Sequence, residues 1–520
     1  RPQQGAGQIY CGAVSRAYRS LLAACLRHRT LAMGALFAAL AVSAAGFLSV
    51  PQSFFPDSAR TKFYIDYWRN SASHIDETAG DMRQIAAYVS KLPGIRNVTE
   101  FVGAGSLRFL FSYDVNSPSP DYGQLVMETD SVEDIDALTP QIEEFLARNF
   151  PSADAMVLRF SDVICIPSKV AVRFSGPDSD VLRELAAQAK EIMRQSGHAR
   201  HIRDDWRPPV KTSRILYSEL KGRSSGITRK DLAQSLQWNF SGVACGAFRE
   251  GDELIPIISR PVREERSFSQ LSSVQVWNAA GRNLPLEAVT NGFETVWVAP
   301  QIWHRDRIPT ITAQCSEWGV NAAQLRDEIK EKIGSIPLPP LYTMEWAGEY
   351  EQKEEALEGV RATFPFFMLL MFLMLMSLFR TLREPVLAFC AIPFALIGVV
   401  AGLLVTGKSF GFMAILGFLG LTGMLLKNSI VLLDQIGLEL KKGRPPYAAL
   451  VEASVSRLRP VTMAAGTTVL GILPLLFDVF FDAMAATIVF GLLAATLLTL
   501  IVIPVGYALA FGVREPRKDS

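Results

Sequence analysis

Cysteine and histidine are scarce in this chain of 520 residues, which contains six cysteines and five histidines. The cysteines are scattered, no CxxC motif occurs, and no cysteine–histidine cluster is present. This pattern argues against a disulfide framework and against a zinc-type site. His198 and His201 have no further ligand near them in the sequence, so we interpret them as surface residues. We therefore expect no metal site and no cofactor.

The chain also lacks a charge excess and a nucleotide-binding motif. Its 52 basic and 51 acidic residues give a formal net charge of +1, which by itself says nothing about partners. We expect no nucleic-acid partner. Without a phosphate-binding loop, we do not expect ATP hydrolysis, and we expect no enzyme activity.

Long apolar runs, by contrast, are abundant. A bilayer core about 30 Å thick requires about 20 apolar residues in a helix. Six runs satisfy this requirement, while the stretch 51–361 reads as ordinary water-soluble protein. We predict transmembrane helices at Thr30–Val50, Ala362–Phe379, Pro385–Gly407, Ser409–Leu433, Pro460–Phe477 and Ala483–Val513.

The placement of basic residues predicts the topology. Basic residues gather before the first run, between the second and third, between the fourth and fifth, and after the last, whereas the other connections are short and poor in cations. By the positive-inside rule both termini are cytoplasmic and the domain 51–361 is exported, which in a bacterium means periplasmic, from the inner membrane. Residues 1–29 form a cytoplasmic lead-in, either an amphipathic surface helix or a basic flank, and 514–520 a cytoplasmic tail.

The exported domain contains a repeat of strand, helix and strand. Lys62–Trp68 alternates like a strand, Thr78–Leu92 has helical periodicity, and Ile95–Phe101 is extended. The same order returns in Lys169–Phe174, Val181–Arg194 and His201–Trp206, with further helices at Asp136–Asn149 and Asn321–Ile333. We predict two ferredoxin-like α+β subdomains, at 51–168 and at 169–210 with 302–361. The stretch 211–301, with a helix at Thr228–Trp238 and several strands, is an inserted module.

Lys427 is the most informative single residue, because it lies deep within the fourth apolar run. A lysine near the bilayer centre costs roughly 2.5–3.5 kcal/mol on insertion scales and normally faces the bundle interior with a partner. The alternative is a side chain that extends to the interface. No acidic residue occurs inside the six apolar runs. We therefore expect its counter-ion on a chain segment outside this sequence, as in a proton relay.

Several motifs together resemble the C-terminal half of resistance-nodulation-division (RND) permeases, in the hydrophobe/amphiphile efflux branch. They are Gly423–Asp434 (GMLLKNSIVLLD), Arg457–Pro460 (RLRP), Leu470–Leu475 (LGILPL), Gly176–Leu182 (GPDSDVL), Gly246–Arg260 (GAFREGDELIPIISR) and Leu338–Glu351 (LPPLYTMEWAGEYE). The resemblance implies a trimer of two-half permeases, with 211–301 as a docking-type insert. It also implies a periplasmic adaptor protein and an outer-membrane channel as partners.

The resemblance assigns roles to residues of the membrane domain. Lys427 corresponds to a lysine that pairs with two aspartates of the N-terminal half, and Asn428 is its usual neighbour. The heavy-metal branch typically has a carboxylate in place of this pair, so that branch is not expected. Arg457 corresponds to an arginine at the cytoplasmic mouth of the proton path, although a positive-inside anchor is equally compatible. Ala464 stands where drug exporters have a hydroxyl residue, and Thr462, Thr467 or Thr468 are candidate substitutes.

The resemblance also points to a substrate pocket around a glycine-rich loop, here Glu100–Tyr113. Gly103 and Gly105 give backbone freedom, and Phe101, Val102, Phe109 and Phe111 offer apolar surface. Alternation places Phe109 and Phe111 on one face of a strand, which is equally typical of ordinary sheet core.

We therefore expect the C-terminal half of a proton-driven exporter of hydrophobic or amphiphilic compounds, a drug:proton antiporter that confers antibiotic resistance. Two alternatives remain. One is an RND protein that exports lipids or other cargo, and the other is a split or truncated subunit that is inactive without its N-terminal half.

Overall fold

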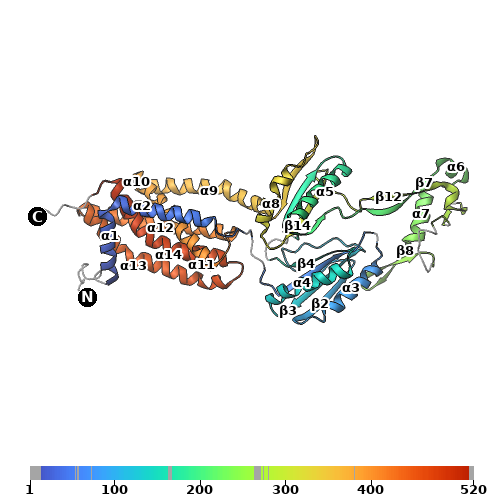
Figure 1. The fold of residues 1–520 in the computed structure, drawn as a ribbon, viewed down its shortest axis with the longest axis horizontal. Helices are drawn as coiled ribbons and strands as arrows, with labels where there is room; N and C mark the ends of the chain where they lie inside the picture. The colour runs from blue at the N-terminus through green and yellow to red at the C-terminus, as the bar shows by residue number, and fades with distance from the viewer. Residues whose placement is uncertain are drawn as a thin grey trace. The chain divides into compact units, whose positions relative to one another are not determined.

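The computed structural model describes residues 13–52, 54, 58–71, 73–161, 167–262, 271–272, 274–278, 280–379 and 381–513 (Figure 1). The predicted tail 514–520 and residues 1–12 of the lead-in lie outside the described residues. The chain divides into two compact units. One combines Arg1–Asp205 with Trp303–Ser520, and the other is Trp206–Ile302.

Within the described ranges, six helical segments are long and apolar enough to cross a membrane, as predicted. They are α2 (Arg29–Phe47), α9 (Glu349–Phe379), α10 (Arg383–Cys390) with η3 (Ile392–Phe394) and α11 (Ala395–Thr406), α12 (Phe412–Lys441), α13 (Pro446–Ile472) with η4 (Leu473–Phe477), and α14 (Asp482–Ala510). Figure 1 shows them gathered in one bundle together with α1 (Ala13–Arg27). Helix α1 is a separate element whose Leu22 and Leu26 are buried, and the Tyr18 hydroxyl donates to the Leu500 carbonyl at 2.7 Å.

Several helices extend well beyond the apolar runs. Helix α9 begins at Glu349 rather than Ala362, and α13 begins at Pro446 rather than Pro460, so Arg457 lies inside a helix and not in a connection. Helix α12 continues to Lys441 and contains Asp434 and Glu439. Both acids follow Leu433, where the predicted apolar run ends, so the run itself contains no acidic residue. Apolar composition marks only the part inside the bilayer, whereas backbone hydrogen bonds carry the helix further.

Helix α14 is the centre of the bundle. Its apolar segment is 67% buried, compared with 6% for α9. It packs against α11 where glycines remove the side-chain spacer: a Cβ added at Gly402 would lie 2.4 Å from the Phe490 Cβ. Small residues at such positions let two helix backbones approach closely in a membrane, where packing rather than water exclusion holds helices together.

The first sheet has the strand order β2-β3-β1-β4. Its elements follow the chain as β1 (Lys62–Trp68), α3 (Ile75–Val89), β2 (Ile95–Val102), β3 (Tyr122–Thr129), α4 (Val132–Asn149) and β4 (Asp154–Arg159). Phe63, Ile65 and Tyr67 of β1 enter one core with buried residues of α3 and α4. Because strand side chains alternate, Tyr64, Asp66 and Trp68 lie on the other face of the sheet.

The second sheet repeats this element order around the inserted module. Strands β5 (Val170–Ser175), β14 (Ile308–Glu317), β13 (Trp303–Arg305) and β15 (Thr343–Gly348) run in the order β13-β14-β5-β15, and β6 (Ala199–Asp204) pairs with β14. Helices α5 (Ser179–Gln195) and α8 (Ala322–Gly334) confirm the two amphipathic helices predicted in this part. Strand β14, which follows the inserted module in the sequence, pairs antiparallel with β5. The second sheet is therefore completed by residues on both sides of the insertion.

The unit Trp206–Ile302 has its own small core. Buried Ile227, Leu232, Val274, Val276 and Leu286 belong to it. Its elements are β7 (Val210–Tyr217), α6 (Glu219–Ser225), α7 (Arg229–Phe240), β8 (Val243–Glu250), β9 (Glu253–Ser259), β10 (Gln275–Trp277), β11 (Asn283–Pro285), η2 (Leu286–Val289) and β12 (Thr290–Val298). The predicted helix and strands of the insert are thereby confirmed.

Candidate functional site in the membrane and the exported domain

Lys427 lies on an exposed stripe of α12. The exposed residues of this helix recur with spacings of three, four and seven, which places them on one face. They are Leu416, Gly420, Gly423, Lys427, Asp434, Leu438 and Lys441. The described part of the chain offers no ion-pair partner to Lys427.

Gly423 and Gly420 lie one and two turns before Lys427 on this stripe. Because they carry no side chain, the helix backbone is accessible there. A Cβ added at Gly420 or Gly423 would meet nothing within 4 Å. These glycines are therefore not needed for packing inside the chain. A helix from another chain segment could approach closely at this face and place a side chain against the lysine.

Asn428 and Ser429 turn from this face into the bundle. Asn428 is 9% exposed and Ser429 is fully buried. The Ser429 hydroxyl has no hydrogen-bond partner among the residues that the structure describes. Asn428 and Ser429 therefore place polar side chains in the interior of the bundle next to Lys427.

Arg457 belongs to a polar cluster that links α13 to the end of α12. Its Nη2 donates to Gln435 Oε1 at 2.7 Å, and the Gln435 amide donates to Glu439 at 3.0 Å. Glu439, with 7% of its side chain exposed, also pairs with Lys442 at 2.7 Å and Arg444 at 3.2 Å. This clamp was not predicted. The signal available in the sequence was Glu439, an acidic residue shortly after the fourth apolar run.

Thr467 lies on an exposed side of α13, and its hydroxyl donates to the Ala464 carbonyl at 2.9 Å. Thr468 and Thr462 likewise bond to carbonyls of the preceding turn. Within the described residues, no hydrogen bond brings these hydroxyls to Lys427. Their place in a proton path stays a prediction.

The glycine-rich segment after β2 is a loop and not a strand. Phe101 and Val102 end β2, Gly103 adopts φ +78°, and Gly105 follows in the loop. The predicted strand that placed two phenylalanines on one face is wrong. Phe109 packs on Phe160 with ring centroids 5.1 Å apart, whereas Phe111 is 92% exposed. The turn at 110–112 interrupts the alternation on which the strand prediction depended.

This loop covers the face of the first sheet that the helices leave open. Tyr113 of the loop is buried against Tyr64 and Phe160. The Ser106 amide and the Tyr113 hydroxyl both donate to Gln124 Oε1, at 2.8 and 3.2 Å. The loop is thereby attached to β3 by defined polar contacts rather than lying free over the sheet.

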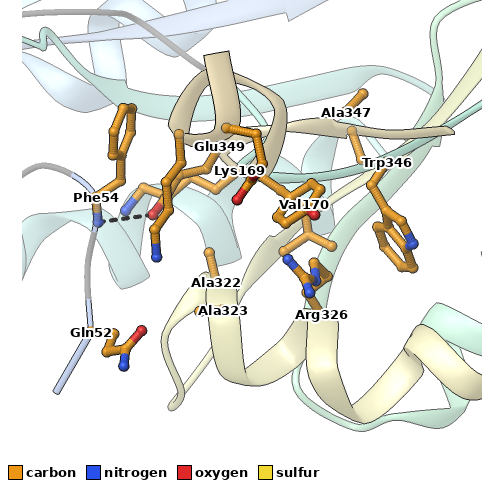
Figure 2. A pocket seen from close by; sticks show the side chains of 14 residues that line it. Gln52, Phe54, Lys169, Val170, Ala322, Ala323, Arg326, Trp346, Ala347 and Glu349 are labelled. Carbon is orange, nitrogen blue, oxygen red and sulfur yellow. Dashed lines mark hydrogen bonds between the residues drawn. The ribbon is translucent and has the colours of Figure 1, made fainter. Parts of the chain in front are cut away.

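A cavity of about 70 Å³ lies where the second sheet and α8 meet the start of α9 (Figure 2). Small side chains of α8 and β5 line it together with Lys169, Arg326 and Glu349. The Phe54 amide donates to Glu349 Oε1 at 3.1 Å, drawn as a dashed line in Figure 2, and the Phe54 carbonyl accepts from the Phe412 amide at 3.1 Å. One residue of the connection after α2 thus contacts the starts of both α9 and α12.

An apolar helical bundle with a lysine on an open face, and two sheets of matching order outside it, defines the class of a membrane transport protein. The chain belongs to the AcrB/AcrD/AcrF family, whose profile matches residues 8–511. This is the RND family of efflux permeases, which are secondary transporters rather than enzymes.

The relatives found are metal-resistance proteins. The chain is 25% identical over 456 residues to "Cobalt-zinc-cadmium resistance protein CzcA" of Cupriavidus metallidurans, covering 83% of this chain and 42% of that protein. It is 23% identical over 512 residues to "Nickel and cobalt resistance protein CnrA" of the same organism, covering 95% and 47%. The chain thus spans about half the length of these relatives. The expected hydrophobe/amphiphile branch finds no support in these comparisons.

A solved structure shares the fold. The crystal structure of a heavy metal efflux pump, form II, matches with a TM-score of 0.78 at 19% identity. The match covers 96% of this chain and 53% of that chain.

Proposed function

We propose that this chain is the C-terminal half of a proton-driven RND exporter that works with an N-terminal half. The observation that carries the proposal is Lys427 on an open, glycine-bordered face of an apolar helix. An ammonium within the apolar thickness of a membrane requires an anionic partner, and the family membership makes export the activity to test.

The coupling step follows from charge. Carboxylates of the second half pair with the Lys427 ammonium while they are ionised. When a proton from the outer side neutralises a carboxylate, the attraction falls and the lysine moves with α12. Arg457 takes part at the cytoplasmic end through Gln435, and Asn428 and Thr467 are further candidates along the path.

For cargo, we propose hydrophobic or amphiphilic compounds. The exported domain carries an apolar ridge at the loop after β2, where Leu107, Phe109 and Phe111 are 86%, 51% and 92% exposed. Apolar and aromatic surface accepts many organic molecules without requiring one shape. Phe101, Val102, Gly103 and Gly105 complete the same segment.

Transition-metal cations are the second candidate cargo. The names of the relatives, which concern cobalt, zinc, cadmium and nickel resistance, favour it. Lipids are a further organic cargo that the same apolar ridge would accept. The presence of Lys427 and Asn428 rather than a carboxylate supports the organic alternative.

The proposed assembly is a trimer in the bacterial inner membrane, with an adaptor protein and an outer-membrane channel. Two ferredoxin-like subdomains and the docking-type insert are periplasmic, and both termini are cytoplasmic. The positive-inside distribution supports this orientation.

The test measures the accumulation of a hydrophobic dye and the tolerance to cobalt and zinc salts in cells that express both halves. We expect proton-dependent dye efflux that falls, in Lys427→Ala, to the level of cells without the transporter. Lys441→Ala, which changes an exposed lysine of the same helix, is the matched control and should keep full efflux.

Membrane content of each variant is measured in parallel. Dye efflux by Lys427→Ala at the wild-type level would contradict the coupling role. Metal tolerance without dye efflux would indicate that the cargo is metal cations rather than hydrophobic compounds.

A further inference from the structure

The start of α9 joins the second sheet without an intervening loop. Strand β15 ends at Gly348, and α9 begins at Glu349. The Glu349 amide donates to the Lys169 carbonyl at 2.9 Å. A Cβ added at Gly348, where φ is +72°, would lie 2.6 Å from the same carbonyl oxygen. Because β15 pairs with β5 over its full length, a shift of the start of α9 moves the second sheet with it.

The connection after α2 contacts the start of α12 through backbone hydrogen bonds. The Phe410 amide donates to the Pro51 carbonyl at 2.8 Å, and the Phe412 amide donates to the Phe54 carbonyl at 3.1 Å. Phe412 is the first residue of α12, the helix that carries Lys427. Phe54 is 3% exposed, and its ring packs edge-on against the Phe412 ring with centroids 5.9 Å apart. We therefore expect Phe54 to move together with the start of α12.

Glu349 joins this connection to α9. The Phe54 amide donates to Glu349 Oε1 at 3.1 Å, as the dashed line in Figure 2 shows. A hydrogen bond from a backbone N–H to a carboxylate is roughly twice as strong as one between neutral groups. Phe54 thus bonds to α12 with its carbonyl and to α9 with its amide.

Packing inside the bundle gives α9 few other ways to follow α12. Within the described residues, the apolar segment of α9 is 6% buried, compared with 39% for α12. Close-packed groups transmit a displacement to their neighbours, whereas an exposed helix surface has no neighbour to move. The hydrogen bonds of Phe54 are therefore a direct route from α12 to the second sheet.

The cavity beside Glu349 leaves room for movement at this point (Figure 2). Ala322 and Ala323 of α8 line it, as does Gln52 of the connection after α2. Its volume of about 70 Å³ exceeds the roughly 10–15 Å³ that a single water molecule requires. The start of α9 can therefore shift against α8 without an overlap of atoms.

We propose that Glu349 couples α12 to the second sheet, because movement of α12 passes through Phe412 and Phe54 to Glu349 and from there to α9 and β15. Glu349 and Phe54 are positioning residues, since they act through helices and a sheet rather than on the cargo or the proton. The proposal rests on the proposed function, in which α12 moves with Lys427 when carboxylates of the second half take up protons. It adds the contact by which that movement leaves the bundle.

The test uses both halves, purified together and reconstituted in liposomes with an imposed proton gradient. Transport of Nile red, a hydrophobic dye, and uptake of protons are measured in the same vesicles, with a trapped pH-sensitive fluorophore for the protons. Glu349→Ala removes the acceptor of the Phe54 amide, so we expect the dye moved per proton to fall about 10-fold. Protons still cross, because Lys427 is intact. Glu349→Gln keeps an oxygen acceptor and should keep this ratio within about 2-fold of wild type.

A second pair of variants interrupts the same route at α12. Phe412→Pro removes the N–H that donates to Phe54, and proline is well tolerated at the first position of a helix. Gly411, with φ −116° and ψ −168°, already has the extended backbone that a following proline requires. Phe412→Ala keeps the N–H and loses only the ring. We expect the dye moved per proton to fall about 10-fold in Phe412→Pro and less than about 3-fold in Phe412→Ala.

Glu354→Ala is the matched control, because Glu354 lines the same cavity but pairs with the exposed Arg361 at 2.8 Å. It should transport dye and protons like wild type. Circular dichroism and the reconstituted amount are measured for each variant. A merely structural role of Glu349 would lower both fluxes together and leave the ratio unchanged in Glu349→Ala. That result, or equal ratios in Phe412→Pro and Phe412→Ala, would overturn the proposal.

The wild-type pair tests the proposed function, and the variants test Glu349. If the wild type exports cobalt and not dye, the same ratio is measured with cobalt. A wild type without proton-dependent export of either compound would refute the proposed function, and the coupling role with it. Coupled export by the wild type, with an unchanged ratio in Glu349→Ala, would remove only the role of Glu349.

Discussion

The contact between α11 and α14 permits a quantitative prediction. A Cβ added at Gly398 would lie 2.5 Å from the Ala494 Cβ, 2.6 Å from the Phe490 carbonyl oxygen and 3.1 Å from the Gly491 Cα. Carbon atoms in favourable contact are about 3.5–4.0 Å apart. Two of the three opposing atoms belong to the backbone, so the clash in Gly398→Ala is relieved only if the helices separate, by roughly 1 Å.

The expected cost follows from two opposing effects. Overpacking a well-packed core typically costs about 1–3 kcal/mol, and separation of the helices also loosens the contact along its length. Alanine regains about 1 kcal/mol over glycine in an exposed helix interior. We expect Gly398→Ala to lower the free energy of unfolding by up to about 2 kcal/mol after this gain.

Gly420→Ala is the matched control. It makes the same chemical change in α12, where the added methyl group meets nothing within 4 Å. In the chain alone we expect it to be neutral or to stabilise by up to about 1 kcal/mol.

The assay is unfolding of the purified chain with increasing mole fraction of sodium dodecyl sulfate, followed by circular dichroism. Gly398→Ala should unfold earlier than wild type, and Gly420→Ala should not. Equal midpoints for the two variants would refute the close contact as the reason for the glycine.

Two further predictions concern the part of the chain that contains the sheets. Burial raises the pKa of Asp205 to about 6, against about 3.9 in an unfolded chain, so the folded state binds more protons and stability falls as pH rises from about 4 to 6. Asp205→Asn can still accept a hydrogen bond from the Thr312 amide. After a discount for partial exposure, this variant should remove roughly 1–2 kcal/mol of the pH dependence of stability, measured by thermal unfolding. An unchanged pH profile would exclude Asp205 as the source of that dependence. Glu351 accepts two hydrogen bonds from Arg173, at 3.0 and 2.9 Å, so Glu351→Ala should destabilise the protein by about 2 kcal/mol. Glu354→Ala loses only an exposed ion pair with Arg361 and should cost less than about 1 kcal/mol. Equal shifts of the thermal unfolding midpoint in the two variants would contradict this prediction.

The branch of the family illustrates how far motifs reach. Gly423–Asp434 and the other motifs led to the RND family, and the family match confirms that assignment. The cargo is a different question, because the motifs identify the family and not the compound that it exports. The relatives named above are metal-resistance proteins, so the comparisons give the expected branch no support.

Periodicity predicted two of the helices that cover the sheets. Thr78–Leu92 and Val181–Arg194 were predicted as amphipathic helices, and α3 and α5 match them to within a few residues. The prediction works because each helix buries one face against a sheet, which requires apolar residues every three or four positions. Phe109 and Phe111 show the limit, since alternation over a few residues also occurs by chance in a loop.

The sequence by itself determined that six segments are long and apolar enough to cross a membrane, because a crossing segment must be apolar over the thickness of the bilayer whatever its neighbours are. It also singled out Lys427, because a charge in such a segment is costly anywhere. Only the tertiary structure decided that Glu439 joins Arg457 through Gln435, and that Asn116 reaches Asp66 from a loop. These contacts join residues from separate elements or distant positions, and the distances between such residues are set by packing rather than by local pattern.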